Sequence, residues 1–130
     1  MVLVHVVWAT RERQPILPIE LDPWLQQTLD ILGRELRCPV LAVGNAADHV
    51  HVLTRLVPTV RLGDLVQRWK GTTSYRAKRT CAVPLSWQDG YWAEAVSPAH
   101  AATLMESIEH QREHHAQGDV RERWQQSEPA

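Results

Sequence analysis

The sequence contains no phenylalanine, only two cysteines and no long hydrophobic run. Cys38 and Cys81 are too few for a disulfide framework and lack the spacing of metal ligands, so we expect free thiols in a reducing cytoplasm. No apolar stretch approaches the roughly 18–20 residues of a membrane span, so we expect no membrane partner. The net charge is only −1, so any attraction to nucleic acid must come from a local patch. Tryptophan occurs six times, a bias for which we have no physical account.

The length of 130 residues, 44% of them hydrophobic, suits one domain with one core. Residues 2–9 (VLVHVVWA) are β-branched and apolar, which predicts a first strand. They follow no basic segment and precede no small-residue cleavage site, so we do not interpret them as a signal peptide. We expect one domain over residues 1–118 and a polar tail over residues 119–130.

Hydrophobic spacing predicts the other elements. A helix begins near Asp22 and carries leucines at positions 25, 29, 32 and 36, the spacing of one helical face. A β-hairpin over 40–57, a helix over 61–79, a short strand over 91–97 and a helix from Pro98 to about His115 follow. This β-α-β-β-α-β-α order predicts an α+β fold, a ferredoxin-like sandwich whose antiparallel sheet carries helices on one face.

Two histidines stand out in the stretch DHVHVL, residues 48–53. Residues i and i+2 of a strand share a face, so His49 and His51 project together. Two parallel imidazoles on a strand are a good start for a divalent metal, provided that a third ligand comes from elsewhere. On spacing alone, two half-exposed polar positions on an amphipathic strand are the favoured interpretation. It does not match nucleotide hydrolases with three alternating histidines, because position 53 is leucine.

The helix predicted over 61–79 is strongly basic. It carries six of the 14 Lys and Arg residues and one acid, Asp64. The basic residues are Arg61, Arg68, Lys70, Arg76, Lys78 and Arg79. They could track the phosphates of a DNA strand, or they could simply be a solvated helix face. Trp69 could stack a base, but its spacing from Leu62 favours the core.

Five stretches together resemble the small single-tyrosine HUH transposases associated with repetitive extragenic palindromes. They are HVVWATRERQPIL, DHVHVL, RLGDLVQRWKGTTSYRAKR, WQDGYWAEAVSPA and SIEHQREHH, and they run nearly from end to end. The resemblance implies that His49 and His51 bind Mg²⁺ or Mn²⁺ with Gln111. It also implies a homodimer that acts on single-stranded or hairpin DNA through a covalent phosphotyrosine.

The tyrosine of the family does not carry over. The family pattern is Tyr-Ile-x-x-Gln, whereas this chain has Ser107, Ile108, Glu109, His110 and Gln111. The position of the nucleophile is therefore Ser107, whose hydroxyl is shorter and harder to ionise than a phenol. Tyr75 and Tyr91, the only tyrosines, match no such position. His114 resembles the first histidine of a family pair and could support the metal ligands or contact DNA.

We therefore expect a metal-binding, DNA-binding protein related to transposases whose covalent strand cleavage and rejoining is impaired. One alternative is a metal-free module that binds nucleic acid or a partner on the same fold. A second is a metal-dependent hydrolase that attacks a phosphodiester with water. His5 is expected to be structural, His100 exposed, and Arg11 and Arg13 could extend the basic surface.

Overall fold

A computed structural model describes residues 2–116, with side chains described through residue 113. The four strands are β1 (Val2–Ala9), β2 (Val40–Asn45), β3 (His49–Leu56) and β4 (Trp92–Val96). The helices are α1 (Asp22–Glu35), α2 (Leu62–Thr80), α3 (Pro98–Glu109) and α4 (Gln111–Ala116), with short 3₁₀ turns at Arg11–Arg13 and Ile19–Leu21. The predicted last helix is thus interrupted at His110.

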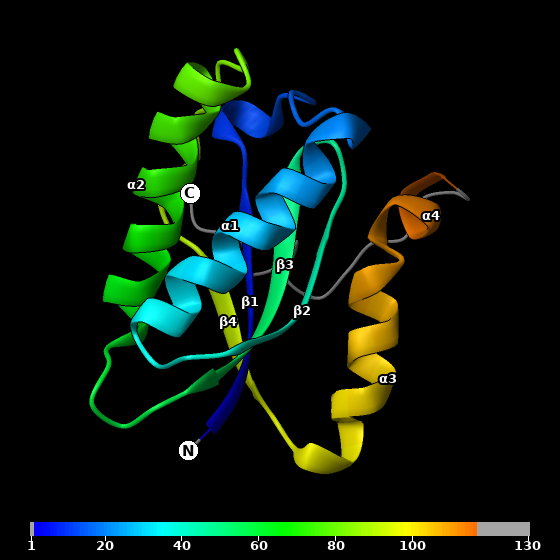
Figure 1. The fold of residues 1–130 in the computed structure, drawn as a ribbon. Helices are drawn as coiled ribbons and strands as arrows, with labels where there is room; N and C mark the ends of the chain where they lie inside the picture. Colours follow the sequence, from blue (N-terminus) through cyan, green and yellow to red (C-terminus); the bar gives the residue numbers. More distant parts are fainter. Residues whose placement is uncertain (1, 117–130) are drawn as a thin grey trace.

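The strands form one antiparallel sheet in the order β2-β3-β1-β4. This order, together with the helix after β1 and the helix after β3, confirms the predicted ferredoxin-like α+β sandwich (Figure 1). The described part of the chain contains no helix long and apolar enough to cross a membrane. Residues 117–130 lie outside the described part, so the division into a domain and a tail stays a prediction.

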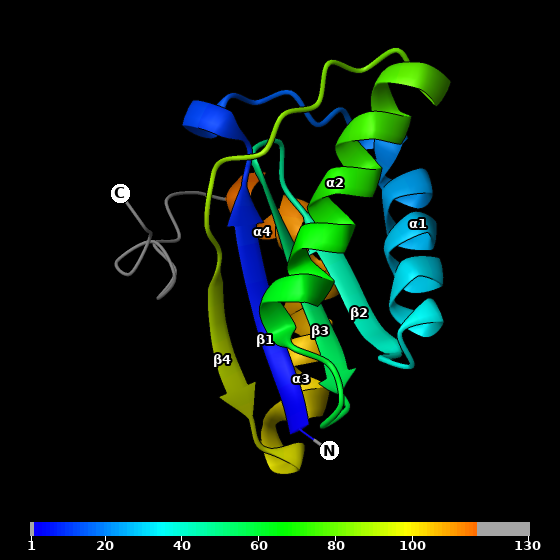
Figure 2. The same cartoon turned by 90° about the vertical axis from the view of Figure 1, so that its left-hand side faces the viewer.

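The placement of the helices corrects one detail of that prediction, because they do not all lie on one face. Helices α1 and α2 cover one face, and α3 packs on the other (Figures 1 and 2). Ile108 of α3 is buried against Ala42 and Leu53, whose side chains belong to that second face. A sheet whose strands carry apolar residues on both faces needs a cover on each side.

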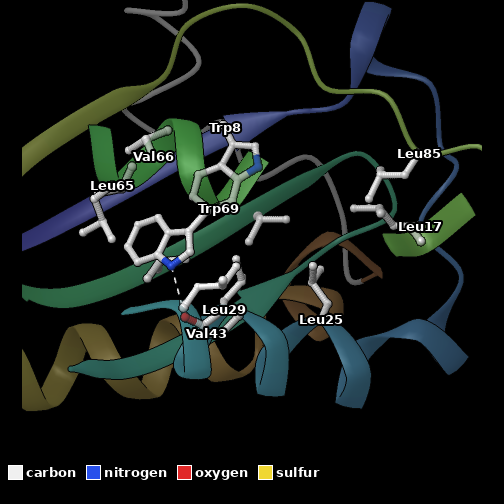
Figure 3. Close-up of a cluster of buried hydrophobic side chains, with 14 of the residues drawn as sticks. Trp8, Leu17, Leu25, Leu29, Val43, Leu65, Val66, Trp69 and Leu85 are labelled. Carbon is white, nitrogen blue, oxygen red and sulfur yellow. Dashed lines mark hydrogen bonds between the residues drawn. The ribbon is translucent and has the colours of Figure 1, made fainter. Parts of the chain in front are cut away.

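The larger core lies between the sheet and helices α1 and α2. Trp8 of β1 and Trp69 of α2 stack with ring centroids 5.7 Å apart, and both are almost fully buried. The indole nitrogen of Trp69 donates a hydrogen bond of 3.0 Å to the carbonyl of Leu29 in α1 (Figure 3). Trp69 is thus a core residue, as its spacing favoured, and it ties the two helices together.

Candidate metal centre

Strand β3 presents His49 and His51 on the sheet face opposite to α1 and α2. Their neighbours Val50 and Val52 belong to the core under those helices, so the two histidines point the other way. The two imidazole rings are 0% and 1% exposed, with centroids 5.0 Å apart. The two side chains therefore lie on one face of the sheet, as predicted, and both are fully buried.

Each imidazole is held through its Nδ1 atom. His49 Nδ1 lies 2.7 Å from Asp48 Oδ1, and His51 Nδ1 lies 2.9 Å from His5 Nε2. Histidines that ligate a metal through Nε2 are commonly oriented by such a contact at the other nitrogen. The structure thus fixes the orientation of both rings through Nδ1, as a metal site that used Nε2 would require.

Asp48 is itself fixed by Arg13, whose Nε donates a hydrogen bond of 3.2 Å to Asp48 Oδ2. Burial alone would raise the pKa of Asp48, but its hydrogen bond and charge interaction with His49, together with those of Arg13, outweigh burial and lower the pKa. Asp48 is therefore an anion that can orient the His49 ring. Arg13, expected on the basic surface, lies beside the histidines instead.

Gln111 follows the point where α3 ends very close to β2. Gly44 of β2 is paired with His51 of β3, and a Cβ atom added to Gly44 would lie only 1.5 Å from the carbonyl oxygen of Ile108. A side chain at that position would keep the helix end away from the sheet. Gln111 follows three residues later and is 2% exposed, and its Nε2 donates a hydrogen bond of 3.2 Å to the Ser107 carbonyl.

The donor atoms suit a divalent cation. One buried side-chain atom that makes no hydrogen bond within the described part of the chain is Gln111 Oε1. Gln111 Oε1 is an acceptor at the end of a side chain whose amide nitrogen is already engaged. Two imidazoles and one amide oxygen fit Mg²⁺ less closely than Mn²⁺, which accepts both donor types. The described residues contain no cluster of three His, Cys, Asp or Glu side chains suited to a metal.

Ser107 lines a pocket of about 590 Å³ between α3 and β4. His5 and Glu94 line the same pocket, and His5 also contacts His51, so the pocket adjoins the histidine pair. Tyr75 and Tyr91 belong to the other side of the sheet: Tyr75 is on α2, and Tyr91 packs against the core beneath it. Ser107, which the sequence predicts at the family's tyrosine position, is thus one of three hydroxyl residues that line this pocket, with Ser97 and Thr103.

The basic helix α2 lies across the sheet from the histidines. Five of the six predicted DNA contacts are exposed on this helix or, for Arg61, at its N-cap, namely Arg61, Arg68, Arg76, Lys78 and Arg79. Lys70 differs, because its ammonium donates hydrogen bonds of 2.6 and 3.0 Å to the carbonyls of Gln88 and Gly90. Burial lowers the pKa of Lys70, and the nearby Asp89 only partly offsets this.

Sequence reasoning missed two supporting residues. His5 was expected to be structural, yet it contacts the His51 ring, and Asp48 was not identified as the partner of His49. No local sequence signal gives the His5 contact, because it depends on the register that pairs Val7 with His51. His100 is exposed, as expected. The side chain of His114 lies outside the described residues.

The fold is that of several solved transposase structures. A candidate transposase from Deinococcus radiodurans R1 is 24% identical, with a TM-score of 0.65 over 85% of this chain and 90% of that chain. A REP-associated tyrosine transposase bound to a REP hairpin is 15% identical, with a TM-score of 0.68 over 88% of this chain and 68% of that chain. No curated protein matches the sequence.

The match to a family model is more specific than these likenesses of fold. The model of the IS200-like transposases matches residues 1–111, which include both histidines, Ser107 and Gln111. The protein belongs to the IS200-like transposase family.

Proposed function

We propose that this protein binds a divalent cation, Mn²⁺ or Mg²⁺, through His49, His51 and Gln111, and acts on single-stranded or hairpin DNA at that centre. The observation that supports the proposal is the buried amide oxygen of Gln111, which follows the point where α3 approaches Gly44, the sheet neighbour of His51. A bound cation would polarise a phosphodiester and stabilise the leaving oxygen.

The residues around the centre have separate tasks in this proposal. Asp48 and His5 hold the two imidazoles in the orientation that a ligand requires. Gln111 is oriented by its own bond to the Ser107 carbonyl, which leaves its oxygen as the third donor. The enclosure of all three side chains excludes water from the donor atoms and strengthens their interaction with a charge.

We further propose that the covalent step of the family is impaired in this chain. The aliphatic hydroxyl of Ser107 replaces a phenol, and an aliphatic hydroxyl needs stronger activation to attack phosphorus. DNA binding would then persist without a phosphotyrosine adduct. The hairpin in the related solved structure supports hairpin DNA as the ligand to test first.

A calorimetric titration with Mn²⁺ tests the metal centre. The wild-type protein is expected to bind one ion, and His49→Ala and Gln111→Ala are each expected to weaken binding by at least roughly 10-fold. Gln27→Ala, which removes an exposed glutamine of α1, is the matched control and should bind like the wild type. Equal affinities in all four proteins would overturn the proposal.

The homodimer implied by the family is a separate part of the proposal. Gln111 is buried within its own chain, which supports a centre built from the residues of one protomer. Light scattering during gel filtration measures the mass directly. We expect the mass of two chains with metal binding unaffected by dilution, and a monomer would remove the dimer from the proposal while leaving the metal centre intact.

A further inference from the structure

A shallow hollow of about 680 Å³ runs along the outer side of α2. We call it the α2 hollow, and its lining residues are Asp64, Gln67, Arg68, Gly71, Thr72, Tyr75 and Arg76. These positions follow one another at helical spacing, so they form a single stripe along the helix. The hollow is on the opposite side of the sheet from His49 and His51, so it is not part of the candidate metal centre.

Tyr75 is the aromatic residue of this stripe, and it is 59% exposed. The guanidinium carbon of Arg79 lies 4.7 Å from the centroid of its ring, close enough for a cation–π interaction. That contact orients the ring while leaving most of its surface open to solvent. An exposed ring flanked by guanidinium groups is the arrangement on which single-stranded nucleic acids stack a base while their phosphates meet the charges.

Gly71 lies one turn before Tyr75, and its presence has no explanation within the chain. A Cβ atom added there would meet nothing within 4 Å. Glycine is the least favourable helix-interior residue apart from proline, so alanine would suit the helix better. A bare backbone in the middle of an exposed helix is useful where an external chain must lie close to it.

The charge of the α2 hollow selects the kind of partner. Arg68 and Arg76 line it with only Asp64 opposing them, and Arg79 stands beside Tyr75. Arg68 also contacts Glu35, but both side chains are nearly half exposed and the pair is easily displaced. A flexible anionic chain with flat, stackable groups complements this combination of guanidiniums, one ring and open backbone.

We propose that the α2 hollow is a second nucleic-acid site, where a single strand stacks one base on Tyr75 and passes its backbone over Gly71. Arg68 and Arg76 meet its phosphates. The proposal rests on the proposed DNA-binding function, which it deepens by placing a strand contact away from the metal centre. Such a site would hold a single strand without a cation.

The test is fluorescence anisotropy with a labelled oligothymidine of 20 nucleotides in the presence of EDTA, which keeps the metal centre out of the measurement. Tyr75→Ala is expected to weaken binding by roughly 10-fold, whereas Tyr75→Phe keeps the ring and should bind like the wild type. Ile31→Ala, which truncates another exposed apolar residue, is the matched control. Unchanged affinity in Tyr75→Ala would overturn the proposal.

Gly71→Ala separates binding from stability. The variant should melt roughly 3–5 °C higher because alanine favours the helix, and yet it should bind the oligonucleotide more weakly. Gly63→Ala, at another exposed glycine of α2, should leave binding unchanged. A Gly71→Ala protein that is stable and binds as tightly as the wild type contradicts the close passage of a strand.

These results are independent of the metal titration. Loss of oligonucleotide binding in Tyr75→Ala supports the α2 hollow even if no variant alters Mn²⁺ affinity. Conversely, loss of Mn²⁺ binding in Gln111→Ala with unchanged oligonucleotide binding in Tyr75→Ala supports the metal centre and overturns the hollow.

Discussion

Arg112, in the first turn of α4, donates two hydrogen bonds to Asp22 and so joins α4 to the start of α1. Arg112 Nε lies 2.7 Å from Asp22 Oδ2, and Nη2 lies 2.8 Å from Oδ1. Nη2 also donates to the carbonyl of Leu17 at 2.9 Å, and Asn45 of β2 donates to Asp22 Oδ1 at 3.0 Å. Since Gln111 is the residue before Arg112, this forked ion pair fixes the backbone that carries the third candidate ligand.

Replacing Arg112 with alanine should therefore reduce both stability and metal affinity. We expect a loss of about 1–3 kcal/mol in the free energy of unfolding, because two charge-assisted bonds of a partly buried pair disappear. Urea denaturation measures that loss, and Mn²⁺ titration of the folded variant should show weaker binding. Arg34→Ala removes an exposed ion pair with Asp30 and is the control, with a cost of only about 0.5 kcal/mol and normal metal affinity.

Gly44 is the second determinant of where Gln111 lies. A methyl group at Gly44 cannot coexist with the Ile108 carbonyl, since the two atoms would be 1.5 Å apart. We expect Gly44→Ala to displace the end of α3, to cost at least about 1–3 kcal/mol as overpacking does, and to weaken Mn²⁺ binding. At Gly63 the nearest atom to an added Cβ is 3.7 Å away, so Gly63→Ala should do neither. Normal metal affinity in a folded Gly44→Ala protein would count against this account of the site.

Much of the fold followed from local patterns in the sequence. The leucine spacing of α1 and the spacing of Trp69 from Leu62 in α2 predicted which faces are buried, because helical periodicity depends only on neighbouring residues. The alternation in β3 likewise predicted that His49 and His51 share a face. These features need no knowledge of distant contacts.

The other features of the fold and of the candidate site depend on contacts between residues far apart in the chain. The face chosen by α3 is decided by the fit of Ile108 over Gly44, and no local pattern encodes that meeting. The contact of His5 with His51 depends on the register of β1 against β3. Lys70 belongs to a helix whose composition suggested phosphate contacts, but its position opposite the loop at Gln88 gives it internal partners.

Lys70 should behave as a structural residue and not as a DNA contact. Lys70→Met keeps the length of the side chain but removes the donor to the carbonyls of Gln88 and Gly90, so we expect a loss of about 1–2 kcal/mol in unfolding free energy. Arg76→Met, on the exposed face, should cost almost no stability but weaken oligonucleotide binding. Urea denaturation measures the stability of both variants, and anisotropy measures their oligonucleotide affinity. A stable Lys70→Met protein with weakened binding, beside a destabilised Arg76→Met protein with normal binding, would contradict this assignment.

Because the pKa of Lys70 is lowered, its contribution to the free energy of unfolding depends on pH. In the alkaline range between its folded and unfolded pKa values, the unfolded chain binds more protons than the folded protein at this residue. The stability of the wild type relative to Lys70→Met should therefore rise with pH across that range. Urea denaturation at several pH values from neutral to alkaline follows the difference, and a fall with rising pH would contradict the assigned direction.

Ser107→Tyr should restore a covalent DNA adduct if the remaining site is intact. The pocket of about 590 Å³ beside Ser107 offers space for a phenol, and its wall includes His5, which contacts the candidate ligand His51. Incubation with hairpin DNA and Mn²⁺ followed by a denaturing gel would show the adduct as a shifted protein band. Ser107→Phe supplies a ring of similar size without the hydroxyl and should give none. If Ser107→Tyr binds Mn²⁺ and the hairpin but forms no adduct, the pocket does not direct a phenol to the phosphate, and the chain has lost more than its nucleophile.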